Sequence, residues 1–290
     1  MAGAAPALRH DARIVGIVAV AHGGSHFFHL VLPPLFPLLR PALDASYAEL
    51  GLLVGAFFAT SGLCQTPAGF LVDRIGAARV LTAGLGCLGG GAVLAGMAPG
   101  YPALLVAAVV MGVGNSVFHP ADYAILGRHV APTRMARAFS IHTLGGTIGW
   151  ALAPPLVAGI AGLVSWRAAL LVSGGLGLAL TALIWAHRPM LETPSHVERM
   201  AAASGAPAPL LRVLLAAPIL LCFLFFTLQA TSFVALQGFM PLSLHQLFGL
   251  DLMAATATVT AFMIGSAAGT LAGGALADPS GRHQRDAKGR

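Results

Sequence analysis

Long apolar runs separated by short polar segments make up most of this chain. A hydrocarbon core about 30 Å thick is crossed by about 20 apolar residues in an α-helix. Runs of at least this length recur eight times along the sequence. The pattern therefore predicts an all-α, multi-pass membrane protein with eight membrane helices. We expect these helices at residues 14–39, 46–72, 79–98, 102–127, 136–163, 167–187, 211–241 and 252–277.

Basic residues are divided unequally among the polar segments. Cytoplasmic loops of membrane proteins carry an excess of Lys and Arg. If the N-terminus is cytoplasmic, all 16 Lys and Arg residues fall in cytoplasmic segments except Arg40 and Arg167. The first apolar run follows Arg9 and Arg13 and is longer than the roughly 7–15 apolar residues of a signal peptide, so it is interpreted as an uncleaved helix. We expect an inner or plasma membrane protein with both termini in the cytoplasm.

Composition excludes several classes of protein. The chain is 57% hydrophobic and 9% charged, whereas soluble domains carry about 25% charged residues. The net charge of +6 does not indicate nucleic-acid binding, because the arginines lie in separate loops. Cys64, Cys87 and Cys222 lie inside apolar runs and fit no disulfide or metal-ligand spacing. The nucleotide-binding pattern G-x-x-x-x-G-K-[ST] does not occur, so neither a nucleotide partner nor a cofactor is expected.

A weak internal repeat divides the chain. The pattern Gly69-x-Leu71-x-Asp73-x-x-Gly76 recurs 205 residues later as Gly274-x-Leu276-x-Asp278-x-x-Gly281. Each copy ends the second helix of its half, and parallel repeats of this kind are typical of one large class of transporters. Three parts are therefore predicted: a six-helix N-terminal half at 1–187, a cytoplasmic linker at 188–210, and a partial second half at 211–290 with two helices and a cytoplasmic tail.

The first copy of the repeat resembles the loop between helices two and three of the major facilitator superfamily. Asp73 and Arg74 stand at a helix end, where they can pair with neighbouring charges and helix termini, and Gly76 permits a tight turn. The resemblance implies a gating role for Gly69, Asp73, Arg74 and Gly76; an ordinary charged loop is the alternative. It also implies twelve helices, so we expect this chain to be C-terminally short, as a truncated, inactive or partial product.

Two further motifs refine the resemblance. Gly145-x-x-x-Gly149, followed by Pro154, is similar to the helix-five motif of proton-coupled exporters, and its small residues favour close helix packing. The stretch Phe118–Asp122 resembles the fosmidomycin-resistance branch of bacterial drug exporters, with its acidic residue displaced by one position. Together these resemblances imply a drug-efflux antiporter driven by protons. An uptake carrier for a polar metabolite remains an alternative.

Polar residues inside the predicted helices are the candidates for a site, because an acidic group at the centre of a membrane costs roughly 2.5–3.5 kcal/mol. The spacing of His22, His26 and His29 places them on one face of the first helix. We expect them to converge at mid-membrane with polar groups of helices four and five. The predicted substrate- and proton-binding residues are His26, His29, His119, Asp122 and His142.

Several interpretations of these residues remain open. The histidines can serve as hydrogen-bonding groups between helices, or bind substrate and protons, since an unperturbed histidine has a pKa of about 6.5. Binding of a metal through three imidazoles is a third interpretation, although no metal site is expected. We expect a secondary carrier that works by alternating access and is not an enzyme. The remote alternative is a membrane-embedded histidine-metal oxidoreductase.

Overall fold

The structure is a computed structural model that describes residues 4–193, 212, 214–249 and 252–280. Its regular elements are helices, and the described residues contain no strand. The chain separates into two compact units, one formed by residues 1–200 with 270–290 and the other by residues 201–269. The prediction of an all-α protein is confirmed within the described residues.

The first unit contains six helical segments that are long and apolar enough to cross a membrane. They agree with the first six predicted spans to within a few residues, apart from longer ends on the first span. The α-helices of this part are α1 (Ala4–His29), α2 (Phe36–Leu43), α3 (Tyr47–Ile75), α4 (Ala77–Gly96), α5 (Tyr101–Asn115), α6 (Phe118–His129), α7 (Met135–Leu163) and α8 (Trp166–Leu191).

Two of these spans are interrupted. In the first, α1 ends at His29, and a 3-10 turn at Pro33–Leu35 leads into α2. Proline lacks the backbone N–H that continues a helix, which explains the interruption. In the fourth, α5 ends at Asn115 and α6 begins at Phe118. This second break lies in mid-span, and the candidate site described below is built around it.

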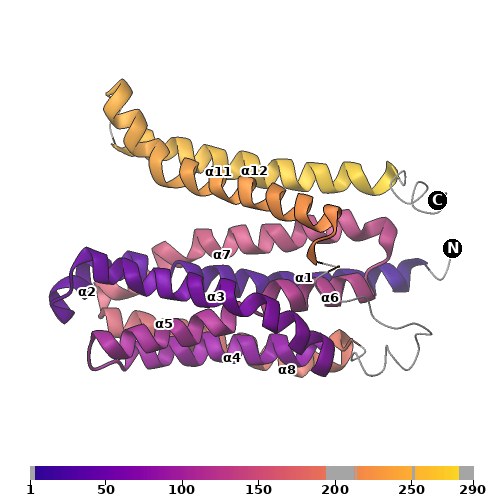
Figure 1. Ribbon diagram of the computed structural model, residues 1–290, viewed down its shortest axis with the longest axis horizontal. Coiled ribbons are helices and arrows are strands. Elements are labelled where there is room, and N and C mark those ends of the chain that lie inside the picture. The colour runs from indigo at the N-terminus through magenta and orange to yellow at the C-terminus, as the bar shows by residue number, and fades with distance from the viewer. Residues whose placement is uncertain (1–3, 194–211, 213, 250–251, 281–290) are drawn as a thin grey trace. The chain divides into compact units, whose positions relative to one another are not determined.

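Glycines allow the helices to pack at short distance. A Cβ atom on Gly149 of α7 would lie 2.0 Å from the carbonyl oxygen of Gly23 on α1, and one on Gly145 would lie 2.3 Å from the carbonyl oxygen of Ala19. Glycine at these positions therefore permits backbone contact between α1 and α7, as expected for small-residue motifs in membranes. A similar contact joins α4 to α8, which run side by side in Figure 1, because a Cβ on Gly177 would lie 2.6 Å from Gly89.

The outer faces of the first unit are apolar. Large side chains such as Leu63 and Leu163 are 79% and 88% exposed, respectively. Exposed apolar surface on this scale is unusual in soluble monomers and suits contact with lipid. The buried polar and charged side chains of this unit include Asp11, His22, Asp122 and His142.

Figure 1 shows the start of α1, the α3–α4 junction, and the ends of α6 and α8 at one end of the first unit. These are arginine-bearing segments predicted to be cytoplasmic, whereas α2 with Arg40 and the start of α8 with Arg167 lie at the other end. The Asp11 carboxylate accepts hydrogen bonds from the Ala131 N–H (3.2 Å) and from Nε of Arg134 (3.0 Å). The Ala77 N–H donates to Oγ1 of Thr193 at 3.0 Å. The common end agrees with the predicted topology, while the side of the membrane on which it lies stays a prediction.

The remaining helices are α11 (Ala217–Phe248) and α12 (Leu252–Ser280). Their described apolar parts, Ala217–Ser232 and Ala261–Leu276, are shorter than a full crossing. The described residues thus give six candidate spans, and the predicted count of eight and the repeat are not confirmed. Most of the predicted linker at 188–210, and the repeat residue Gly281, lie outside the described residues. The predicted domain boundaries therefore stay predictions, although α8 continues four residues beyond the predicted end at 187.

Candidate functional site

Histidines from three helices meet in the interior of the first unit. On α1, the ring centroids of His22 and His26 are 4.4 Å apart, and those of His26 and His29 are 4.8 Å apart. The ring of His22 also lies 3.7 Å from that of His142 on α7 and 5.4 Å from that of His119 on α6. The expected convergence is therefore observed, because α1 packs tightly enough against α7 for its histidine face to reach the neighbouring helices.

The Asp122 carboxylate lies in the middle of this cluster and is completely buried. Its Oδ2 atom is 2.9 Å from Nε2 of His142 and 3.1 Å from Nδ1 of His22. The contact with His142 has hydrogen-bond geometry, whereas Nδ1 of His22 approaches without hydrogen-bond alignment. The other carboxylate oxygen, Oδ1, is buried and has no hydrogen-bond partner among the described residues.

The charge of Asp122 has to be balanced locally. Among the described residues its ion-pair partners are both histidines, which carry charge only when protonated. A buried carboxylate without a counter-charge is strongly unfavourable in a membrane. The cluster therefore suits the binding of a positive species, either a proton on an imidazole or a cation held between the ligands.

A chain of hydrogen bonds runs beside this cluster and defines the tautomer of His29. The indole N–H of Trp150 donates to Nδ1 of His29 at 3.1 Å. Because Nδ1 accepts, the ring proton lies on Nε2, which donates to Oδ1 of Asn115 at 3.0 Å. The amide of Asn115 then donates to Oγ of Ser61 at 2.8 Å. His29 is thus a neutral ring that joins α1 to α7, α5 and α3.

This arrangement changes the interpretation of His29. A doubly protonated ring has no acceptor nitrogen for Trp150, so protonation of His29 would break one hydrogen bond of the chain. The predicted role of His29 in substrate or proton binding is not tested by this geometry and stays a prediction. Trp150, Asn115 and Ser61 were not predicted as site residues, although an Asn inside an apolar run is a signal of a buried polar contact.

His26 and His119 complete the cluster. His26 stacks on Trp150 with a centroid distance of 4.3 Å and an interplanar angle of 30°. The ring of His119 lies 5.6 Å from that of Tyr123. In both histidines Nδ1 is buried without a hydrogen-bond partner among the described residues. These two nitrogens are therefore available to an occupant of the cluster.

The residues of the predicted gating loop and of the helix-five motif lie in different local environments. Gly76 joins α3 to α4 with φ +94°, a conformation that favours glycine. Asp73 and Arg74 are exposed at the end of α3. Gly69 lies within α3, where an added Cβ would meet nothing within 4 Å. Pro154 lies inside α7, which continues through it to Leu163.

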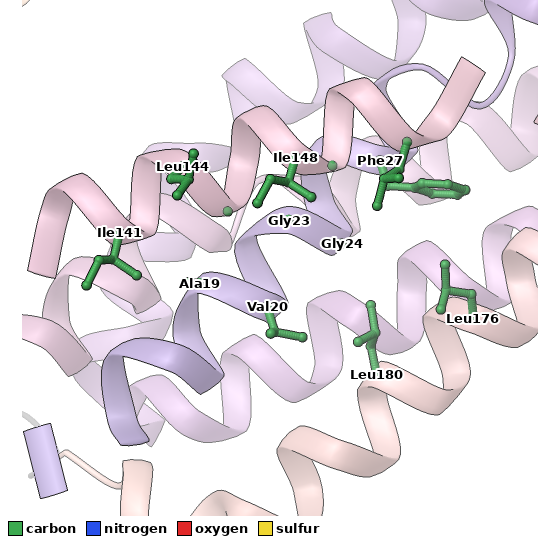
Figure 2. Close-up of a pocket in the computed structure, with 13 residues that line it drawn as sticks. Ala19, Val20, Gly23, Gly24, Phe27, Ile141, Leu144, Ile148, Leu176 and Leu180 are labelled. Atoms are coloured by element: carbon green, nitrogen blue, oxygen red, sulfur yellow. The ribbon is translucent and has the colours of Figure 1, made fainter. Parts of the chain in front are cut away.

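A separate apolar pocket of about 340 Å³ lies on another face of the α1–α7 pair (Figure 2). Val20 and Phe27 of α1, Ile148 of α7 and Leu180 of α8 are among the residues that line it. Gly146 faces the other way, because its Cβ would lie 2.6 Å from Nδ1 of His26. The pocket is thus separated from the histidine cluster by the α1–α7 contact, and its lining lacks side chains that could orient a polar group.

The comparisons with known proteins agree with this architecture. Residues 18–285 match the family model described as Major Facilitator Superfamily. The chain belongs to the major facilitator superfamily. The family and the apolar helices indicate an integral membrane protein, and the family is one of transporters rather than of enzymes. The resemblance stated from the loop and helix motifs is confirmed at the level of the superfamily.

The relatives of this chain have names that refer to different substrates. The fosmidomycin resistance protein of Escherichia coli is 30% identical over 93% of this chain and 66% of its own length. A probable L-galactonate transporter of E. coli is 26% identical over 51% of this chain and 32% of its own length. A multidrug resistance protein B homolog of Mycobacterium tuberculosis is 29% identical over 40% of this chain and 22% of its own length. The chain thus spans less than two thirds of the length of these relatives.

Proposed function

We propose that this chain carries a small molecule by proton-coupled alternating access, in the direction of efflux. The observation that carries the proposal is the buried Asp122 carboxylate between the rings of His22 and His142. Ionisable groups inside a membrane are rare and mark substrate, ion or proton pathways. Because the carboxylate requires a compensating positive charge, loss or gain of a proton there changes the stability of the conformation in which the carboxylate is buried.

The roles proposed for the predicted residues follow from their positions. Five residues in the buried cluster bind substrate and protons: His26, His29, His119, Asp122 and His142. The α3–α4 junction acts as the gating loop through Gly69, Asp73, Arg74 and Gly76. Gly145 and Gly149, at the α1–α7 contact, couple the site to the conformational change of alternating access, and Pro154 lies further along α7. The proposed topology has both termini in the cytoplasm and the helices in the plasma membrane.

Efflux is favoured by the name of the fosmidomycin resistance protein, which is similar to 93% of this chain. Fosmidomycin is therefore the first compound to test. The purified chain is reconstituted in vesicles with an imposed pH gradient, and movement of radiolabelled fosmidomycin is followed. We expect accumulation that stops when a protonophore collapses the gradient. Accumulation that is unchanged by the protonophore contradicts proton coupling.

The site is tested in the same vesicles with Asp122→Asn, which keeps the shape of the side chain but removes its charge. We expect transport to be lost while insertion into the membrane is unchanged. His187→Ala is the matched control, because His187 is only partly buried on α8 and its described hydrogen-bond contact is with the carbonyl oxygen of Leu183 on the same helix. Full activity of Asp122→Asn contradicts the site assignment.

Uptake of a polar metabolite is the second candidate. It is favoured by the probable L-galactonate transporter, which is similar to about half of this chain. The two directions are separated by preparing vesicles of opposite orientation, with labelled galactonate and fosmidomycin as the test compounds. Inward movement of galactonate down a proton gradient, without movement of fosmidomycin, would favour uptake.

A further inference from the structure

Three helices each supply one metal-ligating atom to a single point in the cluster. The atoms are Nδ1 of His22 on α1, a carboxylate oxygen of Asp122 on α6, and Nε2 of His142 on α7, and all lie within 4.8 Å of one another. The three side chains are 3%, 0% and 2% exposed. This is a different set from the three imidazoles of the first helix considered from sequence, because two of its members come from other helices.

The separations of these atoms are close to those of a metal-bound set. Zinc binds imidazole nitrogen at about 2.0–2.1 Å and carboxylate oxygen at about 2.0–2.2 Å, so two ligands in a tetrahedral site are about 3.3 Å apart. The observed distances from Oδ2 of Asp122 are 2.9 Å to His142 and 3.1 Å to His22. An outward shift of a few tenths of an ångström would bring these two separations to about 3.3 Å. The three ligand atoms all lie within 4.8 Å of one another.

The unpartnered atoms are a second, independent observation. Nδ1 of His22 and Oδ1 of Asp122 are buried without hydrogen-bond partners among the described residues. The same holds for Nδ1 of His26 and Nδ1 of His119, the rings of which lie next to His22. Buried polar atoms of this kind are uncommon, and a bound ion or water molecule is one explanation for them. A single proton shared between His142 and Asp122 leaves all four without a partner.

The donor chemistry identifies the class of ion. Two imidazoles and one carboxylate suit zinc and neighbouring divalent transition metals, whereas magnesium and calcium prefer sites made of oxygen atoms. The positive charge of the ion compensates Asp122, which among the described residues pairs only with histidines. Three protein ligands leave the fourth position of a tetrahedral site to water or a further ligand.

We propose that His22, Asp122 and His142 form a site for a divalent transition-metal ion such as Zn²⁺, in the membrane interior. The proposal rests on the proposed function in one respect, since it uses the same buried carboxylate as the substrate and proton site. The ion and the proton are then alternative occupants of one negatively charged position.

The test measures metal binding directly, apart from transport. The chain is purified in detergent with an affinity tag that lacks histidine, incubated with Zn²⁺ at constant pH, and its metal content is determined by mass spectrometry after removal of free ion. Co²⁺ serves as a spectroscopic probe, because its visible absorption reports a tetrahedral environment. We expect about one ion per chain.

Variants locate the ion. His142→Ala and Asp122→Asn are each expected to weaken Zn²⁺ binding by at least about tenfold, whereas His187→Ala, at a partly buried histidine of α8 outside the cluster, should bind as the wild type does. Helix content by circular dichroism and monodispersity in detergent establish that the variants are folded. His22→Gln provides a second test at a position where a variant of similar size and polarity keeps the packing.

Two results would overturn the proposal: Zn²⁺ content well below one ion per chain in the wild type, or equal binding by the wild type and all three site variants. Neither result bears on proton coupling, which is measured by the dependence of fosmidomycin movement on the pH gradient. Conversely, one bound ion together with transport that ignores the gradient removes the proposed function and leaves the metal site intact.

Discussion

The contact between α1 and α7 allows a quantitative test of the packing that brings the histidines together. A Cβ atom introduced by Gly149→Ala would lie 2.0 Å from the carbonyl oxygen of Gly23, whereas real Cβ atoms stay beyond 3.0 Å. Because the interior is close-packed, the two backbones must separate by about 1 Å to accept the methyl group. Overpacking of this kind typically costs about 1–3 kcal/mol.

The expected effect is a lower midpoint of thermal unfolding. For a chain of this size, 1 kcal/mol corresponds to a shift of about 2–4 °C, so the change predicts a loss of roughly 2–12 °C. The measurement is the helical circular dichroism signal of the purified chain in detergent during heating. Gly145→Ala, at which the Cβ would lie 2.3 Å from the carbonyl oxygen of Ala19, should produce a loss of similar size.

Gly159→Ala is the matched control, because Gly159 lies on the same helix and an added Cβ there meets nothing within 4 Å. Alanine is a better helix former than glycine by about 1 kcal/mol, so the control should be as stable as the wild type or more stable. If Gly149→Ala unfolds at the same temperature as Gly159→Ala, then α1 and α7 do not approach as closely as described, and the geometry of the histidine cluster loses its support.

Two further predictions concern the His29–Trp150 hydrogen bond and the glycine between α3 and α4. His29→Leu and Trp150→Phe should show a coupling of about 0.5–3 kcal/mol in a double-mutant cycle of thermal stability, because the two side chains share a hydrogen bond. Strictly additive effects would contradict this hydrogen bond and the tautomer of His29 that depends on it. Gly76→Ala should lower the free energy of unfolding by about 1–3 kcal/mol, because φ is +94° at this position. Gly69→Ala is the control and should leave the free energy of unfolding unchanged or higher, because an added Cβ there meets nothing within 4 Å. Urea unfolding of the two variants measures the difference.

The helices could be predicted from sequence because length and hydrophobicity alone define a membrane span. The first six predicted spans correspond to helices of the structure. The separation of helix four into α5 and α6 was indicated only indirectly, by the polar residues Asn115 and Ser116 inside an apolar run. The predicted span at 102–127 gave no position for this break, since a mean hydropathy over a window is insensitive to the local backbone.

The site was only partly predictable for a related reason. Helical periodicity placed the three histidines of α1 on one face, but which of them contacts Asp122 depends on the depth at which α1 packs against α6. The predicted binding set left out His22, and the structure places His22 against the carboxylate. The partner of His29 lies 121 residues away on α7, and no local pattern indicates a contact at such separation.

The position of Trp150 has a practical consequence for experiments on this chain. Of the three tryptophans, Trp166 lies beneath the guanidinium of Arg167 and Trp185 beneath that of Arg188, outside the histidine cluster. Trp150 alone stacks on a histidine of the cluster. With Trp166 and Trp185 replaced by phenylalanine, the intrinsic fluorescence of the chain becomes an optical signal from the site itself, and ligands can be screened without a label.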